Sequence, residues 1–128
     1  MSDPDPAPDP DPEASGDLSG LTIERATAED VPRLVELQHR AFRTEADLYG
    51  EHIVPYNETV AEVLEALGKC DIWKATIGGQ IVGQIRGHVD ERGVCQVGRL
   101  SVAPEWRRRG IARRLMATLH AAYPDCVA

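Results

Sequence analysis

The segment of this chain best suited to chemistry is a run of three arginines, residues 107–109, followed by Gly110. It lies between an apolar, strand-like segment at 100–102 and a helix-like segment that ends near Tyr123. The first amides of a helix have no partner within it, and the helix dipole adds partial positive charge at that end. Gly110 has no Cβ, so the backbone there can lie close to a ligand. This order of strand, basic turn and helix predicts a site for a phosphate group.

The spacing of apolar residues predicts the elements that would position this turn. Alternation with a period of two indicates strands, and recurrence at i, i+3 and i+4 indicates helices. The order is β-α-α-β-β-β-α, which predicts an α/β-type sandwich of helices packed on a sheet. Strands are predicted at Leu21–Arg25, Asp71–Ile77, Gln80–Val89 and Val94–Val102, and helices at Glu29–Arg43, Glu58–Leu67 and Gly110–Ala122.

All three of these helices have an apolar face, and short signals mark where elements begin and turn. Thr27 or Asp30 is expected to cap the first helix, and Gly78-Gly79 predicts a tight hairpin between two strands. The expected buried positions are Val31, Leu34, Val35, Gln38 and Phe42 on the first helix, Val60, Val63, Leu64 and Leu67 on the second, and Ile111, Leu115 and Leu119 on the last.

The first twenty residues differ in composition from the rest of the chain. Residues 1–20 hold six acidic residues, no Lys or Arg, and a near alternation of Asp and Pro, so they are expected to form a disordered acidic tail. Subtracting those six from the 21 acidic residues leaves 15 against 14 basic ones, although the whole chain has a net charge of −7. Residues 21–128 are therefore expected to form one nearly neutral domain, and the global charge identifies no partner.

The pattern Arg107-x-x-Gly110-x-Ala112 resembles the Arg/Gln-x-x-Gly-x-Gly/Ala signature of the GCN5-related N-acetyltransferases, the GNAT family. The lead-in at 100–106 is similar to that family's strand-then-loop approach to its signature. The resemblance implies a mixed, mostly antiparallel sheet with helices on both faces. It also implies that the turn holds the pyrophosphate of acetyl-coenzyme A, while the preceding strand splays and pairs with the pantetheine arm. The implied coenzyme contacts are Leu100, Ser101, Val102, Arg107, Arg108, Arg109, Gly110, Ile111, Ala112 and Arg113.

The resemblance further implies transfer of an acetyl group from the thioester to an amine, which is either a small molecule or a protein amine. Several family members place a carboxylate in the first half of the strand before the signature, but this chain has Cys95, Gln96 and Val97 there. No catalytic acid or base is therefore assigned. Acceptor contacts are expected in the loop Thr44–Tyr56, whose candidate residues are Glu45, Asp47, Tyr49, Glu51, His52 and Tyr56.

The printed sequence ends at Ala128, where the family's fifth strand would begin, so the domain is expected to be incomplete at its C-terminus. Three interpretations stay open at this point. The chain is a truncated gene product, it is completed by another chain or as a homodimer, or it is a non-catalytic remnant that binds acyl-coenzyme A.

Other functions are less well supported by the residues. The arginines at 107–109, with Arg113 and Arg114, would suit nucleic-acid phosphates, but only Trp106 lies nearby and the rest of the domain is not basic. The four histidines and three cysteines lack metal-ligand spacing, so no metal cofactor is expected. No apolar run approaches the roughly 18 residues of a membrane span, and no secretory signal is present. A cytoplasmic protein without membrane contact is expected.

Overall fold

The computed structural model describes residues 18–43, 48 and 57–124. Its four strands form one antiparallel sheet in the order β1-β2-β3-β4. The α/β prediction is confirmed, and the second and third strands have the predicted bounds. The strands are β1 (Thr22–Arg25), β2 (Asp71–Ile77), β3 (Gln80–Val89) and β4 (Cys95–Val102). The helices are η1 (Ala28–Asp30), α2 (Val31–Ala41), α5 (Val60–Leu67), η2 (Pro104–Trp106) and α6 (Ile111–Ala122).

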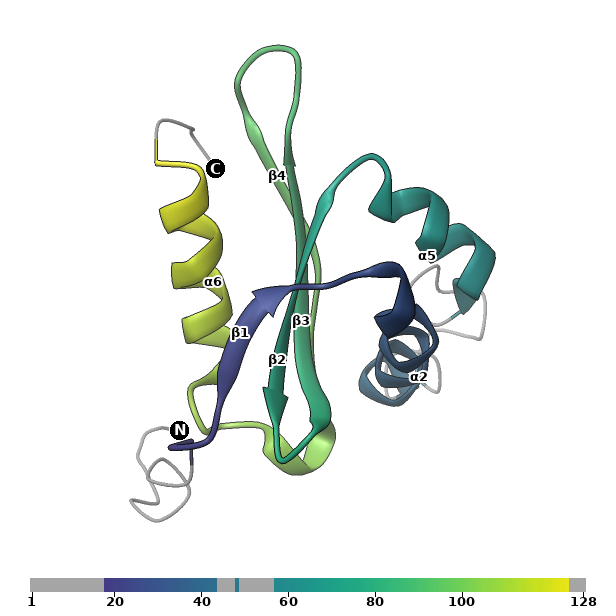
Figure 1. Cartoon of the computed structure of the whole chain (residues 1–128), viewed down its shortest axis with the longest axis vertical. Coiled ribbons are helices and arrows are strands. Elements are labelled where there is room, and N and C mark those ends of the chain that lie inside the picture. Colours follow the sequence, from purple (N-terminus) through teal and green to yellow (C-terminus); the bar gives the residue numbers. More distant parts are fainter. Residues whose placement is uncertain (1–17, 44–47, 49–56, 125–128) are drawn as a thin grey trace.

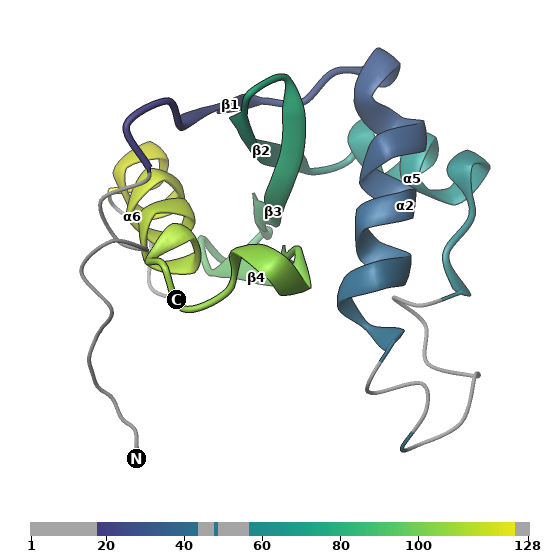
Figure 2. The same cartoon turned by 90° about the horizontal axis from the view of Figure 1, so that it is seen from below.

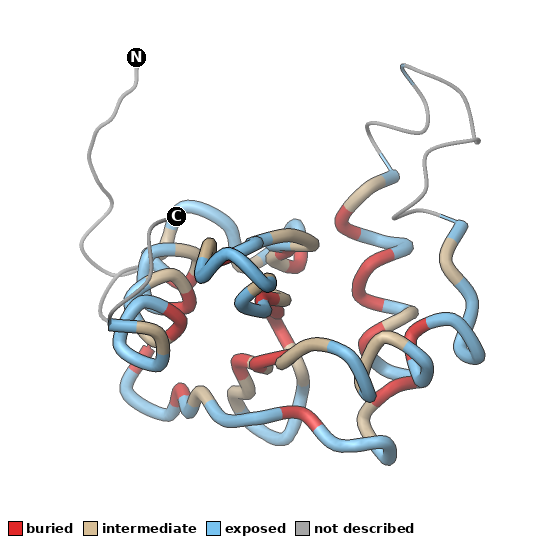
Figure 3. The backbone as a smooth tube through the Cα atoms, turned by 90° about the horizontal axis from the view of Figure 1, so that it is seen from above, coloured by how far each residue is buried: buried red, intermediate tan, exposed pale blue. Residues whose placement is uncertain are grey.

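Helices cover both faces of the sheet, as the family resemblance implies. Helix α6 lies against one face, and α2 and α5 lie against the other (Figures 1 and 2). The buried positions follow this division, since they line the inner sides of the helices and the strands between them (Figure 3). The sheet therefore separates two apolar cores.

The core under α6 depends on glycines in β3. Ile111, Leu115 and Leu119 are at most 1% exposed, which confirms the predicted stripe. They pack on β3 where Gly83 and Gly87 leave room, and a Cβ built on Gly87 would lie 2.6 Å from Leu119 Cδ1. The helix approaches this closely because the strand presents no side chain at those two positions.

The core under α2 and α5 contains most of the predicted residues, but the buried face of α2 is turned around the helix axis relative to the predicted face. Val31, Leu34 and Gln38 are buried as expected. Leu37 and Ala41 are also buried, whereas the predicted Val35 and Phe42 are half-buried. On α5, Val63 is buried as expected and Leu67 is half-buried, but the prediction is wrong for Val60 and Leu64, which are exposed. Helix α2 contacts α5 as well as strands β3 and β4, so its buried face is wider than a single stripe.

Polar side chains fix where these helices begin. Thr27 and Asp30 form a capping box at η1, in which the backbone amide of Thr27 donates to Asp30 Oδ2 over 2.9 Å. Thr59 and Glu62 form a second capping box at the start of α5. The predicted role of Thr27 and Asp30 in capping is thus confirmed.

Strand β4 contains an irregularity that the sequence pattern did not indicate. Gln84 is opposite Ser101, but Arg86 is opposite Gly98, so Arg99 and Leu100 share the space across from Ile85. Two residues against one define a β-bulge. Arg99 has φ of 53°, a left-handed conformation that is uncommon for a residue with a side chain.

The limits of the described residues decide which predictions about the tail, the acceptor loop and the C-terminus can be compared with the structure. Leu18, which falls within the predicted tail, is buried in the core under α6, and the amide of Leu21 donates to its carbonyl over 2.9 Å. The folded part therefore includes Leu18. The predicted tail up to residue 17, the acceptor-loop candidates Glu45, Asp47, Tyr49, Glu51, His52 and Tyr56, and the expectation about the C-terminus lie outside the described residues.

Candidate functional site

The turn that joins β4 to α6 is the first part of the candidate site. The amide of Ala103 donates to Val82 O over 2.8 Å, and the amide of Trp106 donates to Ala103 O over 2.8 Å. These bonds hold the path of the chain from the end of β4 through η2. Arg108 and Gly110 then adopt left-handed conformations, with φ of 66° and 89°. The chain reverses over a few residues and presents the N-terminus of α6.

The amides of this turn are available to a ligand. Among the described residues, no group accepts a hydrogen bond from the amides of 108–110, and those at the start of α6 have no partner within the helix. A Cβ built on Gly110 would meet no atom within 4 Å, so the backbone there borders open space. Exposed amides and a helix N-terminus suit a pyrophosphate, and this geometry fits the predicted ligand.

The arginines of the turn have different surroundings. Arg107 donates from Nε to Val102 O over 3.2 Å and from Nη2 to Ala41 O over 2.8 Å. Arg109 lies over the ring of Trp106, with its Cζ 4.8 Å from the ring centroid. Arg108 and Arg113 are exposed, and no described residue pairs with either side chain. Arg108 and Arg113 are therefore the cations of the predicted set most available to a phosphate.

The predicted residues of β4 offer mainly backbone groups. Ser101 is 4% exposed, and its Oγ donates to Arg99 O over 2.8 Å, so the hydroxyl is engaged within its own strand. Leu100 is 38% exposed and Val102 packs against the core under α6. Strand β4 lies at one edge of the four-stranded sheet. Its outer backbone groups can pair with an extended ligand arm.

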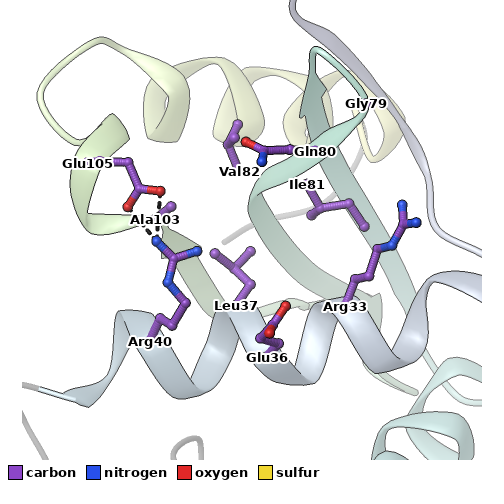
Figure 4. Close-up of a pocket in the computed structure, with 10 residues that line it drawn as sticks. All are labelled: Arg33, Glu36, Leu37, Arg40, Gly79, Gln80, Ile81, Val82, Ala103 and Glu105. Atoms are coloured by element: carbon purple, nitrogen blue, oxygen red, sulfur yellow. Dashed lines mark hydrogen bonds and ion pairs between the residues drawn. The ribbon is translucent and has the colours of Figure 1, made fainter.

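A pocket of about 280 Å³ lies on the other side of η2, between α2 and the start of β3 (Figure 4). The ion pair of Arg40 with Glu105 forms one wall, with Nη2 at 2.5 Å and 2.7 Å from the two carboxylate oxygens. This pairing lowers the pKa of Glu105. None of the predicted coenzyme residues lines the pocket, although Ala103 and Glu105 place it beside the turn.

A charged cluster beside the bulge is a further part of the site. Glu58 accepts hydrogen bonds from Gln38 Nε2 at 2.8 Å, from both terminal nitrogens of Arg86 at 3.1 Å and 3.3 Å, and from Arg99 Nε at 3.4 Å. Its side chain is 10% exposed. The sequence analysis missed this cluster, because its members lie far apart in the chain and no short motif joins them.

The cluster keeps Glu58 ionised. Burial by itself raises the pKa of Glu58, but the hydrogen bonds from Arg86 and Gln38 and the charge of Arg86 outweigh it and lower the pKa from 4.5 to about 2. A carboxylate with so low a pKa is a poor proton acceptor at neutral pH. Glu58 is therefore not suited to be the general base of a reaction on the adjacent strand.

No group of three His, Cys, Asp or Glu side chains among the described residues is arranged to hold a metal ion. None of the helices in the described part of the chain is both long and apolar enough to cross a bilayer.

Similarity to solved structures supports the fold. The PaiA N-acetyltransferase of Thermoplasma acidophilum, in complex with coenzyme A, aligns with a TM-score of 0.72 at 15% identity, over 81% of this chain and 72% of that one. A GNAT-family acetyltransferase of Brucella melitensis, in complex with acetyl-CoA, aligns with a TM-score of 0.65 at 22% identity, over 81% and 68%. An acetyltransferase of Vibrio fischeri aligns with a TM-score of 0.66 at 20% identity, over 84% and 90%.

Sequence comparison adds a family match. No curated protein matches the chain. Residues 68–127 match the family model of the acetyltransferase (GNAT) domain, and this segment includes β2, β3, β4, the turn and α6. Together with the fold, this match confirms that the chain resembles the GNAT family of acetyltransferases, a resemblance carried by Arg107, Gly110 and Ala112.

Proposed function

We propose that this protein is an acetyl-coenzyme A-dependent N-acetyltransferase. The observation that carries the proposal is the turn between β4 and α6, where free amides, a left-handed Gly110 and exposed arginines meet at a helix N-terminus. Two structures of similar fold contain coenzyme A or acetyl-CoA. Their presence supports this ligand class for the turn.

Each part of the site has a role in this proposal. The amides of 108–112 and the side chains of Arg108 and Arg113 bind the pyrophosphate. The outer edge of β4, at Leu100 and Val102, pairs with the pantetheine arm as an added strand would. Arg107 shapes the turn through its bonds to Val102 O and Ala41 O. The thioester is thereby directed along β4 toward the bulge.

The reaction is acyl transfer. The nitrogen of a neutral amine attacks the thioester carbonyl carbon, a C–N bond forms, the C–S bond breaks, and the thiolate leaves as coenzyme A. The amine loses one proton and the thiolate gains one, so no further reagent is consumed. This reaction does not by itself specify the acceptor amine. One protein of similar fold, an aminoglycoside acetyltransferase from a soil metagenomic sample, was solved in complex with sisomicin and aligns at 22% identity with a TM-score of 0.64.

A pair of ligands tests the coenzyme site directly. Acetyl-CoA carries the pyrophosphate and the 3′-phosphoadenosine, and S-acetyl-pantetheine lacks both, so calorimetric titration with the two ligands measures what the nucleotide half, including the pyrophosphate at the turn, contributes. We expect acetyl-CoA to bind at least about 10-fold more tightly, since charge-assisted hydrogen bonds to a phosphate are worth roughly 1.5–3 kcal/mol each. Equal affinities, or no heat from acetyl-CoA at millimolar concentration, would overturn the proposal.

A second candidate is a coenzyme-binding protein without turnover. One observation favours it, namely that Glu58, the carboxylate that contacts Arg99 in the bulge, is held ionised by three side chains and is a poor base. Release of free thiol from acetyl-CoA in the presence of amines separates the two candidates. Amine-dependent thiol release identifies the transferase, and tight binding without release identifies the binder.

A further inference from the structure

Arg99 has an unusual combination of position and bonding in the bulge of β4. Its Nε donates to Glu58 over 3.4 Å, and its side chain is 26% exposed. Among the described residues, no group accepts a hydrogen bond from its two terminal nitrogens. A guanidinium whose Nε is held and whose terminal nitrogens are free presents a planar fork of donors.

The surroundings of Arg99 have an excess of positive charge. Arg86 directs both terminal nitrogens to Glu58, and its Nε is buried without a hydrogen-bond partner in the described part of the chain. One carboxylate thus faces two guanidinium groups, of which Arg86 is the tightly bound one. A second carboxylate, that of Asp71 at the start of β2, is already bonded to Arg25 and Tyr123. A half-buried cation that shares its one carboxylate partner, Glu58, with a second guanidinium favours an anionic ligand.

The backbone also singles out Arg99. A φ of 53° is disfavoured for any residue with a Cβ, and such conformations concentrate at functional positions. A purely structural ion pair does not require it, because Arg86 already neutralises Glu58 from regular strand geometry. The bulge turns the side chain of Arg99 toward Glu58 on the face covered by α2 and α5.

The location relates Arg99 to the coenzyme. Val102 and the turn that follows it lie at the C-terminal end of β4, and Arg99 lies three residues earlier on the same strand, at a distance of at most about 10 Å, the span of three residues in a regular strand. An arm that starts at the turn and follows the edge of β4 runs toward Arg99. The reactive end of the coenzyme is therefore expected on the Arg99 side of Val102.

We propose that Arg99 recognises a carboxylate on the acceptor, so that the preferred acceptors are small amines that also carry a carboxylate, such as amino acids. This inference rests on the proposed transferase function, which it extends by naming the acceptor class. The free fork of Arg99 binds the carboxylate with two parallel hydrogen bonds, and Glu58 positions the guanidinium through Nε. The acceptor amine is then held near the end of the arm.

Matched acids and amides test the assignment. Glycine with glycinamide, β-alanine with β-alaninamide, and 4-aminobutyrate with its amide differ only in the charge of the group that Arg99 would bind. Two readouts are taken with each pair, kcat/KM from thiol release with acetyl-CoA and affinity for the protein saturated with coenzyme A. For at least one pair, we expect the acid to be favoured about 10- to 100-fold in either readout, the range of a charge-assisted hydrogen bond.

Two substitutions connect that preference to one residue. Arg99→Asn removes the charge with a side chain that tolerates the left-handed conformation, and Arg99→Lys keeps the charge but loses the fork. We expect Arg99→Asn to abolish the preference for acids and Arg99→Lys to restore only part of it. Arg92→Gln is the matched control, because Arg92 is 82% exposed in the β3–β4 turn and pairs with Asp90. It should behave as the unsubstituted protein.

The outcomes separate this inference from the proposed function. Acid and amide acceptors of equal kcat/KM and affinity, a preference that survives Arg99→Asn, or no saturable binding of any acid up to its solubility limit would each overturn the carboxylate assignment. Acetyl-CoA affinity is measured in the same samples and should be unchanged in the folded Arg99 variants. If the unsubstituted protein does not bind acetyl-CoA, the proposed function itself is contradicted.

Discussion

The guanidinium of Arg107 donates a hydrogen bond to the backbone carbonyl of Ala41, the last residue of α2, over 2.8 Å. The same side chain reaches Val102 O at the end of β4. The turn that we assign to the pyrophosphate is therefore tied to a helix on the opposite face of the sheet. Arg107, the first residue of the family signature, has a structural role besides any contact with a phosphate.

Arg107→Ala is expected to weaken both the fold and the coenzyme site. Loss of the two carbonyl contacts should lower the free energy of unfolding by about 1–3 kcal/mol, and the loosened turn should bind acetyl-CoA less tightly. Urea unfolding and calorimetry measure the two effects. Arg113→Ala is the control for stability, because Arg113 is exposed and no described residue pairs with it. An unchanged unfolding midpoint in Arg107→Ala would refute the structural role.

Gly110→Ala tests the backbone of the turn. A side chain at φ of 89° is strained whatever space surrounds it, so the substitution should cost about 1–2 kcal/mol of stability and should also weaken acetyl-CoA binding. Gly93→Ala is a close match, since Gly93 has φ of 79°, no atom within 4 Å of a built Cβ, and a place in the β3–β4 turn. It should cost similar stability and leave the affinity unchanged. If both variants lose affinity equally, the turn has no special role.

Gly87→Ala tests the packing of α6 on β3. The new Cβ would lie 2.6 Å from Leu119 Cδ1 and 3.3 Å from Tyr123 Cε2, so the buried Leu119 side chain must move, at a cost of about 1–3 kcal/mol. Gly98→Ala is the matched control on β4, where a built Cβ meets no atom within 4 Å. Thermal unfolding should show a lower midpoint for Gly87→Ala alone. Equal midpoints would mean that α6 adjusts without strain.

Glu58→Gln should change how stability depends on pH. The pKa of Glu58 falls from 4.5 to about 2 in the folded protein, so its contribution is complete above about pH 4.5 and is lost as the pH falls toward 2. The variant should lose about 1–3 kcal/mol at pH 7 and less in acid. Urea unfolding between pH 2.5 and 7 measures the difference. Glu91→Gln, at an exposed position of the β3–β4 turn, should change neither value.

Much of the fold could be predicted from local pattern. Gly78 and Gly79 are both left-handed in the structure, and the strands on either side of them have the predicted bounds. The stripe of α6 was also predicted, because its spacing alone determines which residues share a face. These features depend on neighbours within one or two turns of the chain.

The rest depends on contacts across the sheet. The bulge at Arg99 adds one residue to a strand whose alternation continues on both sides of it, so the extra residue leaves little trace in the apolar pattern. The partners of Glu58 lie 20, 28 and 41 residues away, and their meeting requires the sheet to be assembled first. The burial of Leu37 in place of Phe42 likewise reflects how deeply α2 sits against β3.

The division of the apolar interior into two cores has a consequence for how such a protein can diverge. The proposed phosphate turn leads into α6 on one face and is tied to α2 through the bond of Arg107 to Ala41 O, whereas the cluster around Arg99 is supported from α2 and α5 on the other face. Substitutions in the second core can reshape the surroundings of Arg99 while the packing of α6 stays intact. Under the proposed function, one coenzyme turn can therefore serve different acceptors through changes on a single face.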